Sequence, residues 1–320
     1  MNNIMIINLK QRILDRLVRS KRNSVREKLV FKFLSLLKDK LFSKDETFVK
    51  YNFYGKDIVL PFSHDLPVNK SLFPLYSDNI GRIALYLKQK YDNLKVIDIG
   101  ANIGDTAFII KSKTDIPILC IEGDKKYFSL LEKNISYLNN VYAENCFIGV
   151  ETGKKEYVYY KGSGKIVESN TSNNKISFSS LSSVINKNQL FSDSKFIKID
   201  TDGFDCSIIR SEIEFIKKHK PVIFFEYDPY FLSNIDDDGV SVFNTLYKAG
   251  YSKMIIYENT GEYLLSVELN QEQIIEDIHM FYSSRKGEKY CDICVFHKED
   301  DDIWSLIRGK ELEFFSENKN

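Results

Sequence analysis

The chain has 320 residues, of which 43% are hydrophobic and 28% charged, which is typical of a soluble globular protein and long enough for one large domain with an extension or for two small domains. No apolar run reaches the roughly 18 residues needed to cross a bilayer, and Ile4–Ile7 is too short for the core of a signal peptide. Lys plus Arg and Asp plus Glu both number 45, and the five cysteines, an odd number, argue against a disulfide framework. A cytoplasmic protein is expected.

The N-terminal residues 1–47 are predicted to form a basic helical extension. Residues 1–45 contain twelve Lys or Arg against four Asp or Glu, and apolar residues recur at helical spacing over residues 9–43. Packing on the main domain or on a second subunit is the favoured interpretation. Contact with an anionic membrane, at the inner face, is the alternative, in which case removing residues 1–45 should weaken liposome binding. Exposed aromatic residues do not interleave with the basic ones, which disfavours nucleic acid as a partner.

The next elements along the chain precede an alternating pattern. Residues 48–60 predict two short strands, residues 61–76 a proline-punctuated loop, and Ile80, Ile83 and Leu87 the buried face of a helix. Apolar strands are then expected at 95–99, 117–121, 196–199 and 221–225, with helices from Thr106 and over 125–138, the latter capped by Asp124.

Short apolar strands that alternate with helices predict a doubly wound, mostly parallel α/β sheet covered on both faces. Residues 252–258 and 290–297 read as two further strands with no helix between them, and they would form an antiparallel edge. The expected domains are the extension 1–47, a catalytic domain 48–298 and an acidic C-terminal tail 299–320. Residues 162–165 (GSGK) are expected to form a flexible loop.

The stretch KVIDIGANIGDTAF, residues 95–108, carries the strongest motif. It does not fit the dinucleotide pattern G-x-G-x-x-G, because Asn102 and Asp105 replace glycines, and it lacks the Gly-Lys-Ser/Thr of a phosphate-binding loop. It does contain D-x-G-x-N-x-G, formed by Asp98, Gly100, Asn102 and Gly104. This resembles the first motif of class I S-adenosylmethionine-dependent methyltransferases, which have a Rossmann-like fold.

The chemistry of S-adenosylmethionine agrees with that resemblance. The molecule carries no phosphate, glycines allow close backbone approach, and Asp98 can meet the cationic amino group. A ribose requires a carboxylate at the end of the next strand, and Glu122 stands 18 residues beyond Gly104.

A third motif, FIKIDTDGFD at residues 196–205, narrows the resemblance to the FkbM family of methyltransferases, over residues 60–298. That family joins a motif like DIGANIGD to a later K-I-D-V-E-G-F-E; here Thr201 replaces Val, and Asp202 and Asp205 replace Glu. Ser182 and Ser183 stand where the family often has an acidic pair, and Gly149 where a side chain could touch adenine.

The resemblance implies O-methylation of a hydroxyl on a saccharide or natural-product acceptor, with S-adenosylmethionine as the cofactor; no residue is assigned as a metal ligand, and the sequence does not identify a metal requirement. A bacterial surface glycan is the expected setting, and a homo-oligomer remains open. The cofactor-binding residues that it implies are Asp98, Gly100, Asn102, Gly104, Asp105 and Glu122.

The catalytic candidates stand at strand ends beside the first motif. Asp200 is the first choice for a general base or acceptor-orienting carboxylate, and the alternative is that it only caps its own turn. Glu226 and Asp228 end the next strand and are candidates for binding acceptor hydroxyls or a divalent ion; solvated strand ends are an equal alternative. His64 lies in the preceding loop and is a candidate for closing over the site.

Other features have simpler interpretations or define competing functions. Cys291 and Cys294 would face opposite sides of a strand, so buried apolar roles are expected rather than a metal site. Asp200-Thr201-Asp202 also matches the D-x-D of metal-dependent glycosyltransferases, which is the main rival function. A non-catalytic Rossmann-like binding module is the third candidate.

Overall fold

The computed structural model describes residues 2–20, 22–41, 47–149, 155–160, 163–168, 177–285, 287 and 289–317. The strands, in chain order, are β1 Phe48–Phe53, β2 Lys56–Pro61, β3 Val96–Ile99, β4 Ile118–Ile121, β5 Val141–Glu144, β6 Phe147–Ile148, β7 Lys155–Tyr160, β8 Ser163–Glu168, β9 Phe178–Ser179, β10 Phe196–Ile199, β11 Val222–Tyr227, β12 Tyr251–Glu258, β13 Tyr263–Glu268 and β14 Cys291–His297. The α-helices are α1 Asn2–Arg19, α2 Val25–Leu41, α3 Leu66–Leu72, α4 Asp78–Lys90, α5 Asp105–Lys113, α6 Lys125–Ile135, α7 Leu181–Lys187, α8 Asp205–Ser211, α9 Ile213–His219, α10 Pro229–Ser233, α11 Ser241–Lys248, α12 Glu272–Ser283 and α13 Asp301–Glu317.

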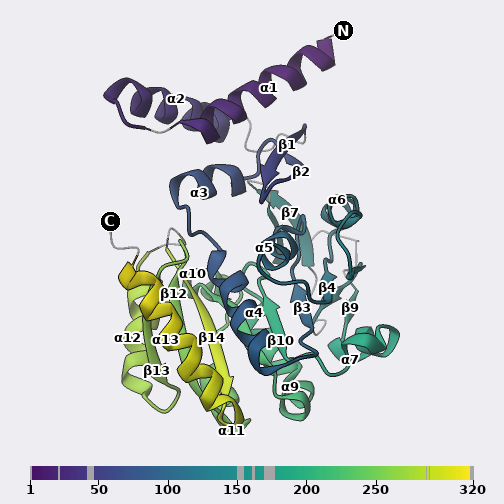
Figure 1. The fold of residues 1–320 in the computed structure, drawn as a ribbon, viewed down its shortest axis with the longest axis vertical. Helices are drawn as coiled ribbons and strands as arrows, with labels where there is room; N and C mark the ends of the chain where they lie inside the picture. Colours follow the sequence, from purple (N-terminus) through teal and green to yellow (C-terminus); the bar gives the residue numbers. More distant parts are fainter. Residues whose placement is uncertain are drawn as a thin grey trace.

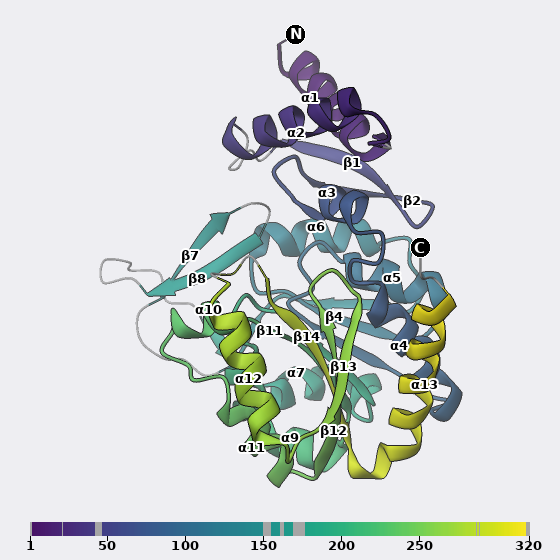
Figure 2. The ribbon, with the colours of Figure 1, turned by 90° about the vertical axis from the view of Figure 1, so that its left-hand side faces the viewer.

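An eight-stranded sheet forms the centre of the protein, in the order β13-β12-β14-β11-β10-β3-β4-β5 (Figures 1 and 2). The five strands from β11 to β5 are parallel, and the strand order reverses beside β3. The predicted doubly wound α/β fold is therefore confirmed. In this topology the carboxyl ends of β3, β4, β10 and β11 meet at one edge.

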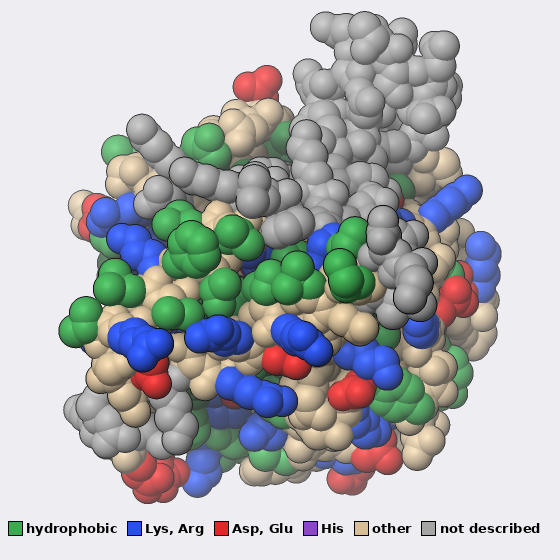
Figure 3. All heavy atoms as spheres, turned by 90° about the horizontal axis from the view of Figure 1, so that it is seen from above, with side chains coloured by type: hydrophobic (Ala, Val, Ile, Leu, Met, Phe, Trp, Pro, Cys, Tyr) green, Lys and Arg blue, Asp and Glu red, His purple; other side chains and the backbone are tan. Residues whose placement is uncertain are grey.

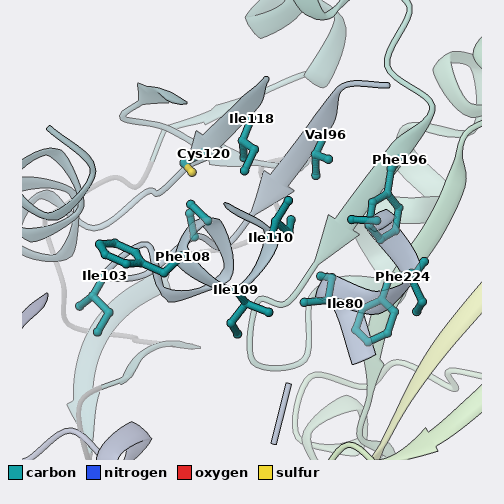
Figure 4. Packing of buried hydrophobic residues seen from close by; sticks show 14 of the residues in the cluster. Ile80, Val96, Ile103, Phe108, Ile109, Ile110, Ile118, Cys120, Phe196 and Phe224 are labelled. Atoms are coloured by element: carbon teal, nitrogen blue, oxygen red, sulfur yellow. The ribbon is translucent and has the colours of Figure 1, made fainter. Parts of the chain in front are cut away.

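Two hydrophobic layers cover the two faces of the sheet. On one face, Val96, Ile118, Phe196 and Phe224 pack against α4 and α5, including Ile80 (Figure 4). On the other face, alternate strand residues pack against α7, α8, α11 and α12. Cys294 belongs to the first layer and Cys291 to the second, and both are fully buried, as their spacing in a strand predicted.

The antiparallel edge is larger than the sequence suggested. Between β12 and β14 the chain forms β13 and then α12, where a direct connection without a helix was expected, so that expectation was wrong. β14 lies between β11 and β12 and runs antiparallel to both. The amino end of β14 therefore lies beside the carboxyl end of β11.

The C-terminal residues form part of the fold. The segment predicted as an acidic tail contains α13, which packs along α4 (Figure 2). Glu311, fully buried on α13, accepts two hydrogen bonds of 2.8 Å from the guanidinium of Arg82 on α4. Two charge-assisted hydrogen bonds offset the desolvation of this buried pair and fix the helix on the domain.

The N-terminal helices dock on the domain through α3 and the β1–β2 hairpin (Figure 1). Leu17 on α1, Phe31 on α2 and Val68 on α3 form a small hydrophobic cluster. The buried ammonium of Lys38 on α2 donates to the carbonyl of Ser63 at 2.9 Å and to Asp65 at 2.7 Å. The extension therefore contacts the loop that contains His64.

Two predicted loops contain regular structure. The proline-punctuated loop 61–76 includes helix α3, which begins with Pro67 in its first turn, a position that tolerates the missing N–H. In the GSGK segment, Ser163–Lys165 belong to strand β8, which pairs with β7; Gly162 lies outside the described residues. Within the described ranges, no helix has the length and apolar character needed to span a membrane.

Candidate active site

Two hollows lie at the edge where the parallel strands end, and Gly100, Asn102, Asp200 and Asp202 line both of them. The larger hollow, of about 270 Å³, opens toward α3 and α4. The smaller, of about 70 Å³, lies toward α8, and Glu122, Phe147 and Phe178 are among its walls. Motifs that lie far apart in the sequence therefore meet at one place in the fold.

The strand register explains why these residues meet. Asp98 on β3, Lys198 on β10 and Phe224 on β11 are direct neighbours across the sheet. Two residues further along each strand come Gly100, Asp200 and Glu226, and the register pairs Glu226 with Asp292 on β14. Because side chains alternate between faces, this second row points the same way as the first.

Gly100 is required by the contact between the first motif and the third. Its φ is +81°, and a Cβ at this position would lie 1.8 Å from the carbonyl oxygen of Asp200. Its N–H donates to the carbonyl of Ile121 at 2.9 Å, which ties the loop to β4 as well. The glycine therefore sets the spacing between the loop of the first motif and the end of β10.

Glu122 holds the same loop from the other side. One carboxylate oxygen accepts from the N–H of Asn102 at 2.8 Å, and the other accepts from the N–H of Asp124 at 2.7 Å. The carboxyl group is buried, and burial raises the pKa of Glu122 to about 7 although both backbone hydrogen bonds oppose the shift. A carboxylate has about four acceptor positions, so two remain for a ligand.

Lys198 is the cation at the centre of the site, a role that the sequence did not assign. Its ammonium lies 3.2 Å from Asp98 and 3.1 Å from Asp200. Burial disfavours the charge, but Asp200, Asp98 and Asp105 outweigh it and raise the pKa of Lys198. Lys198 therefore stays protonated and orients the carboxylate of Asp200.

Asp98 and Gly104 lie behind the walls of the hollows. Asp98 is fully buried, and its carboxylate lies beside the ammonium of Lys198. Gly104 precedes the first residue of α5, and its Cα packs toward Leu131. Asp105, at the start of α5, does line the larger hollow, and burial raises its pKa to about 6.

The turn after β10 leaves Asp200 accessible. Asp205, not Asp200, accepts from the backbone N–H groups of Thr201 and Gly203, at 3.1 and 3.2 Å. The side chain of Asp200 is 48% exposed and lines both hollows. Asp205 therefore performs the turn-closing role that had been considered for Asp200.

The ends of β11 and β14 add further carboxyl groups to the larger hollow. Glu226 lines it, and one of its carboxylate oxygens is buried without a hydrogen-bond partner. Asp292, which the sequence analysis did not select, lies opposite on β14. Asp228, in contrast, caps α10 by accepting from the N–H of Tyr230 and is buried away from the hollow.

His64 lines the larger hollow, as its place in the loop suggested. Its Nδ1 accepts from the N–H of Leu66 at 3.1 Å, and burial lowers its pKa to about 4. The neutral ring must then carry its proton on Nε2. His64 is therefore a hydrogen-bond donor at this site and not a base.

The comparisons with known proteins decide the class of this site. The family model of the methyltransferase FkbM domain matches residues 98–253, from Asp98 into β12. Residues 98–253 are a methyltransferase FkbM domain. The match confirms the predicted family, the enzyme class and the cofactor, S-adenosylmethionine. The matched range is narrower than the resemblance over 60–298, and among curated proteins no sequence matches the chain.

Solved structures that resemble the chain include other methyltransferases. A methyltransferase FkbM from Methylobacillus flagellatus has 14% identity and a TM-score of 0.31, and the alignment covers 76% of this chain and 54% of that one. An O-methyltransferase from Bacillus cereus, in complex with SAH, has 14% identity and a TM-score of 0.37, with 73% and 88% covered. A precorrin-6y C5,15-methyltransferase from Geobacter metallireducens has 13% identity and a TM-score of 0.37, with 68% and 87% covered. Similarity at this level says nothing about substrate.

The residues of the methyltransferase domain fit S-adenosylmethionine. The bend at Gly100 leaves no side chain between the loop and a ligand, and the side chain of Asn102, which interacts with His64, stands at the wall of both hollows. Glu122 retains acceptor positions toward the smaller hollow, where Phe147 and Phe178 supply aromatic faces. Gly149 packs near Phe178, so these rings occupy the region where the sequence suggested a missing side chain.

Glu122 gives the methyltransferase domain a testable pH dependence. Below pH 7 its carboxyl group takes up a proton and loses acceptor strength for hydroxyl donors, so S-adenosylmethionine affinity should fall. We expect binding about tenfold weaker at pH 5.5 than at pH 8, measured by isothermal titration. The Glu122→Gln variant is the control, and it should bind weakly with a flatter pH profile; an unchanged profile would exclude Glu122 as the titrating group.

Proposed function

We propose that the protein transfers the methyl group of S-adenosylmethionine to a hydroxyl group of a saccharide or natural-product acceptor, in the synthesis of a bacterial surface glycan. The observation that carries the proposal is Asp200, which is half-exposed, lies at the wall of both hollows and is held by Lys198. The polar lining of the larger hollow, which includes Asn69, Asn79 and Asn259, supports a polyhydroxylated acceptor.

The proposed reaction needs alignment and a proton acceptor. S-adenosylmethionine supplies an already activated methyl group. The bond between the acceptor oxygen and the methyl carbon forms as the carbon–sulfur bond breaks, its electrons remain on sulfur, and the hydroxyl proton passes to Asp200. Lys198 holds Asp200 in place, and Glu226 accepts a hydrogen bond from the acceptor.

Titration of the purified protein tests the cofactor and the acceptor class together. S-adenosylmethionine and S-adenosylhomocysteine should bind with micromolar dissociation constants, because the loop and Glu122 are already positioned. UDP-sugars with manganese should give no heat. Heat from the UDP-sugars with none from the first pair would contradict the proposal and support the D-x-D interpretation.

We further propose that the N-terminal helices rest on an anionic membrane surface at the inner face, where a lipid-linked acceptor would be presented. The buried side of α2 faces α1 and α3, while Val25, Leu29, Phe33 and Leu36 form an exposed apolar stripe at helical spacing. Lys28 and Lys32 are exposed beside this stripe. Figure 3 views this side of the molecule and shows hydrophobic and basic side chains gathered together. A second subunit on the same stripe is the alternative.

Replacing the centre of the stripe tests the membrane contact. The double variant Leu29→Ser, Phe33→Ser should bind phosphatidylglycerol vesicles about tenfold more weakly, because two exposed apolar side chains no longer insert. Leu312→Ser, which changes an exposed leucine on α13, is the control and should bind normally. Equal vesicle binding together with a change in sedimentation would instead favour a dimer.

A further inference from the structure

The larger hollow continues from Asp200 toward the end of β14. Its wall on the side of β14 is formed by Glu226, Asp292 and Asn79, and Asn79 comes from the first turn of α4. Glu226 and Asp292 follow Asp200 in the same row across the sheet, and Asn79 reaches this wall from α4. A molecule whose hydroxyl reaches Asp200 would contact them.

The charge of this hollow is strongly unbalanced. Among the residues that the structure describes, six carboxyl groups line it and Lys198 is the single Lys or Arg in its wall; the six are Asp65, Asp105, Asp200, Asp202, Glu226 and Asp292. Lys198 is already engaged by Asp98 and Asp200. In the part of the chain that the structure describes, no lysine or arginine forms an ion pair with Glu226 or Asp292.

Burial and the nearby charge of Asp200 favour the protonated forms of both facing carboxyl groups. Burial, and then the charge of Asp200, raises the pKa of Asp292 to about 8 and raises that of Glu226 as well. A pair that is partly protonated both donates and accepts hydrogen bonds, as hydroxyl groups require. The ammonium group of a ligand can take the place of these protons and balance the two carboxylates. A carboxylate or phosphate group of a ligand is repelled by them.

Asn79 is an independent sign that this wall binds a ligand. Its side chain is fully buried, and Oδ1 accepts from the N–H of Ile80 at 3.0 Å. Its Nδ2 lies near enough to Asp292 to lower the pKa of that carboxyl group, yet donates no hydrogen bond of good geometry. An unsatisfied buried donor is costly, and a ligand acceptor atom would satisfy it.

We propose that Glu226, Asp292 and Asn79 form the acceptor subsite, and that it selects a non-anionic sugar ring with hydroxyl or amino groups beside the methylated hydroxyl. The inference rests on the proposed function, because it assigns the acceptor class for the same reaction. A uronic acid or phosphorylated ring is excluded at this position.

Saturation-transfer NMR on the protein saturated with S-adenosylhomocysteine tests the subsite directly. The probes are neutral methyl hexosides of gluco, galacto and manno configuration, their 2-amino counterparts and their uronates. Neutral or amino probes should bind, and the matching uronates should bind about tenfold or more weakly. Glu226→Gln and Asp292→Asn should weaken the amino probes more than the neutral ones, while Glu313→Gln, an exposed carboxylate on α13, should change nothing.

Binding of S-adenosylhomocysteine is measured first in every variant, so that loss of the fold or of the proposed function is recognised separately. With that binding intact, three results would overturn the subsite. The first is that uronates bind as well as the neutral probes, and the second is that none of the probes binds. The third is that a magnesium ion binds without any sugar and that Glu226→Gln and Asp292→Asn both abolish this binding.

Discussion

Among substitutions that add a single methyl group, Gly100→Ala is expected to disrupt the site most. The added Cβ would lie 1.8 Å from the carbonyl oxygen of Asp200, and the backbone at φ +81° disfavours any side chain. The ends of β3 and β10 must separate to relieve this overlap. We expect a loss of about 3 kcal/mol in unfolding free energy and a loss on the order of 100-fold in S-adenosylmethionine affinity.

Gly55, in the turn between β1 and β2, provides a matched control for backbone conformation. Its φ is +78°, but a Cβ there would meet no atom within 4 Å. Gly55→Ala should therefore cost about 1 kcal/mol and leave cofactor affinity unchanged. Denaturant melts and titrations of the two variants compare them; if both variants behave alike, the contact between Gly100 and Asp200 is not what requires glycine.

Asp200→Asn should lower turnover by about 100-fold while S-adenosylmethionine affinity stays within about threefold. The amide keeps the shape of the side chain but cannot accept the hydroxyl proton. Asp205 still closes the turn through the N–H groups of Thr201 and Gly203, so the loop should keep its conformation. Initial rates with saturating cofactor, together with titration, separate the two effects.

Asp193→Asn is the control for the loss of one carboxylate. Asp193 is exposed and pairs with Lys95, so neutralising it should change neither rate nor affinity by more than about twofold. Undiminished turnover in Asp200→Asn would show that Asp200 is not the base. A parallel loss of cofactor affinity would mean that its role is to position Lys198.

The membrane and acceptor proposals are linked through one contact of the extension. Lys38, on the buried side of α2, holds Ser63 and Asp65, which flank His64 in the wall of the larger hollow. The helices that carry the exposed apolar stripe therefore also hold part of the proposed acceptor site. This arrangement would place a lipid-linked saccharide near the reacting hydroxyl.

Periodicity predicted the elements whose burial is uniform, and it missed those whose partners are distant. The strands that became β3, β4, β10 and β11 are short apolar runs, and their helices show one apolar face. The C-terminal segment looked like a tail because its acidic residues dominate its composition. Its role depends on Glu311 meeting Arg82, 229 residues away, which no local pattern contains.

For the site, the carboxyl ends of parallel strands were a sound guide because they all meet at one edge. They led to Gly100, Glu122, Asp200 and Glu226. Asp292 was missed because β14 is antiparallel, so the residues at that edge stand near the beginning of the strand. The signal that was available is a single charged residue inside the apolar run Cys291–His297.

Short motifs and the order of the strands were enough to predict the α/β fold, the family and the loop that meets the cofactor. The roles of the carboxyl groups depend instead on contacts between strands that are distant in the sequence. Because of strand register and burial, Asp98 pairs with Lys198, Asp205 accepts the hydrogen bonds that close the turn after β10, and Asp292 lies opposite Glu226. Similar carboxylates in sequence acquire different roles because protonation, exposure and pairing are set by neighbours on other strands.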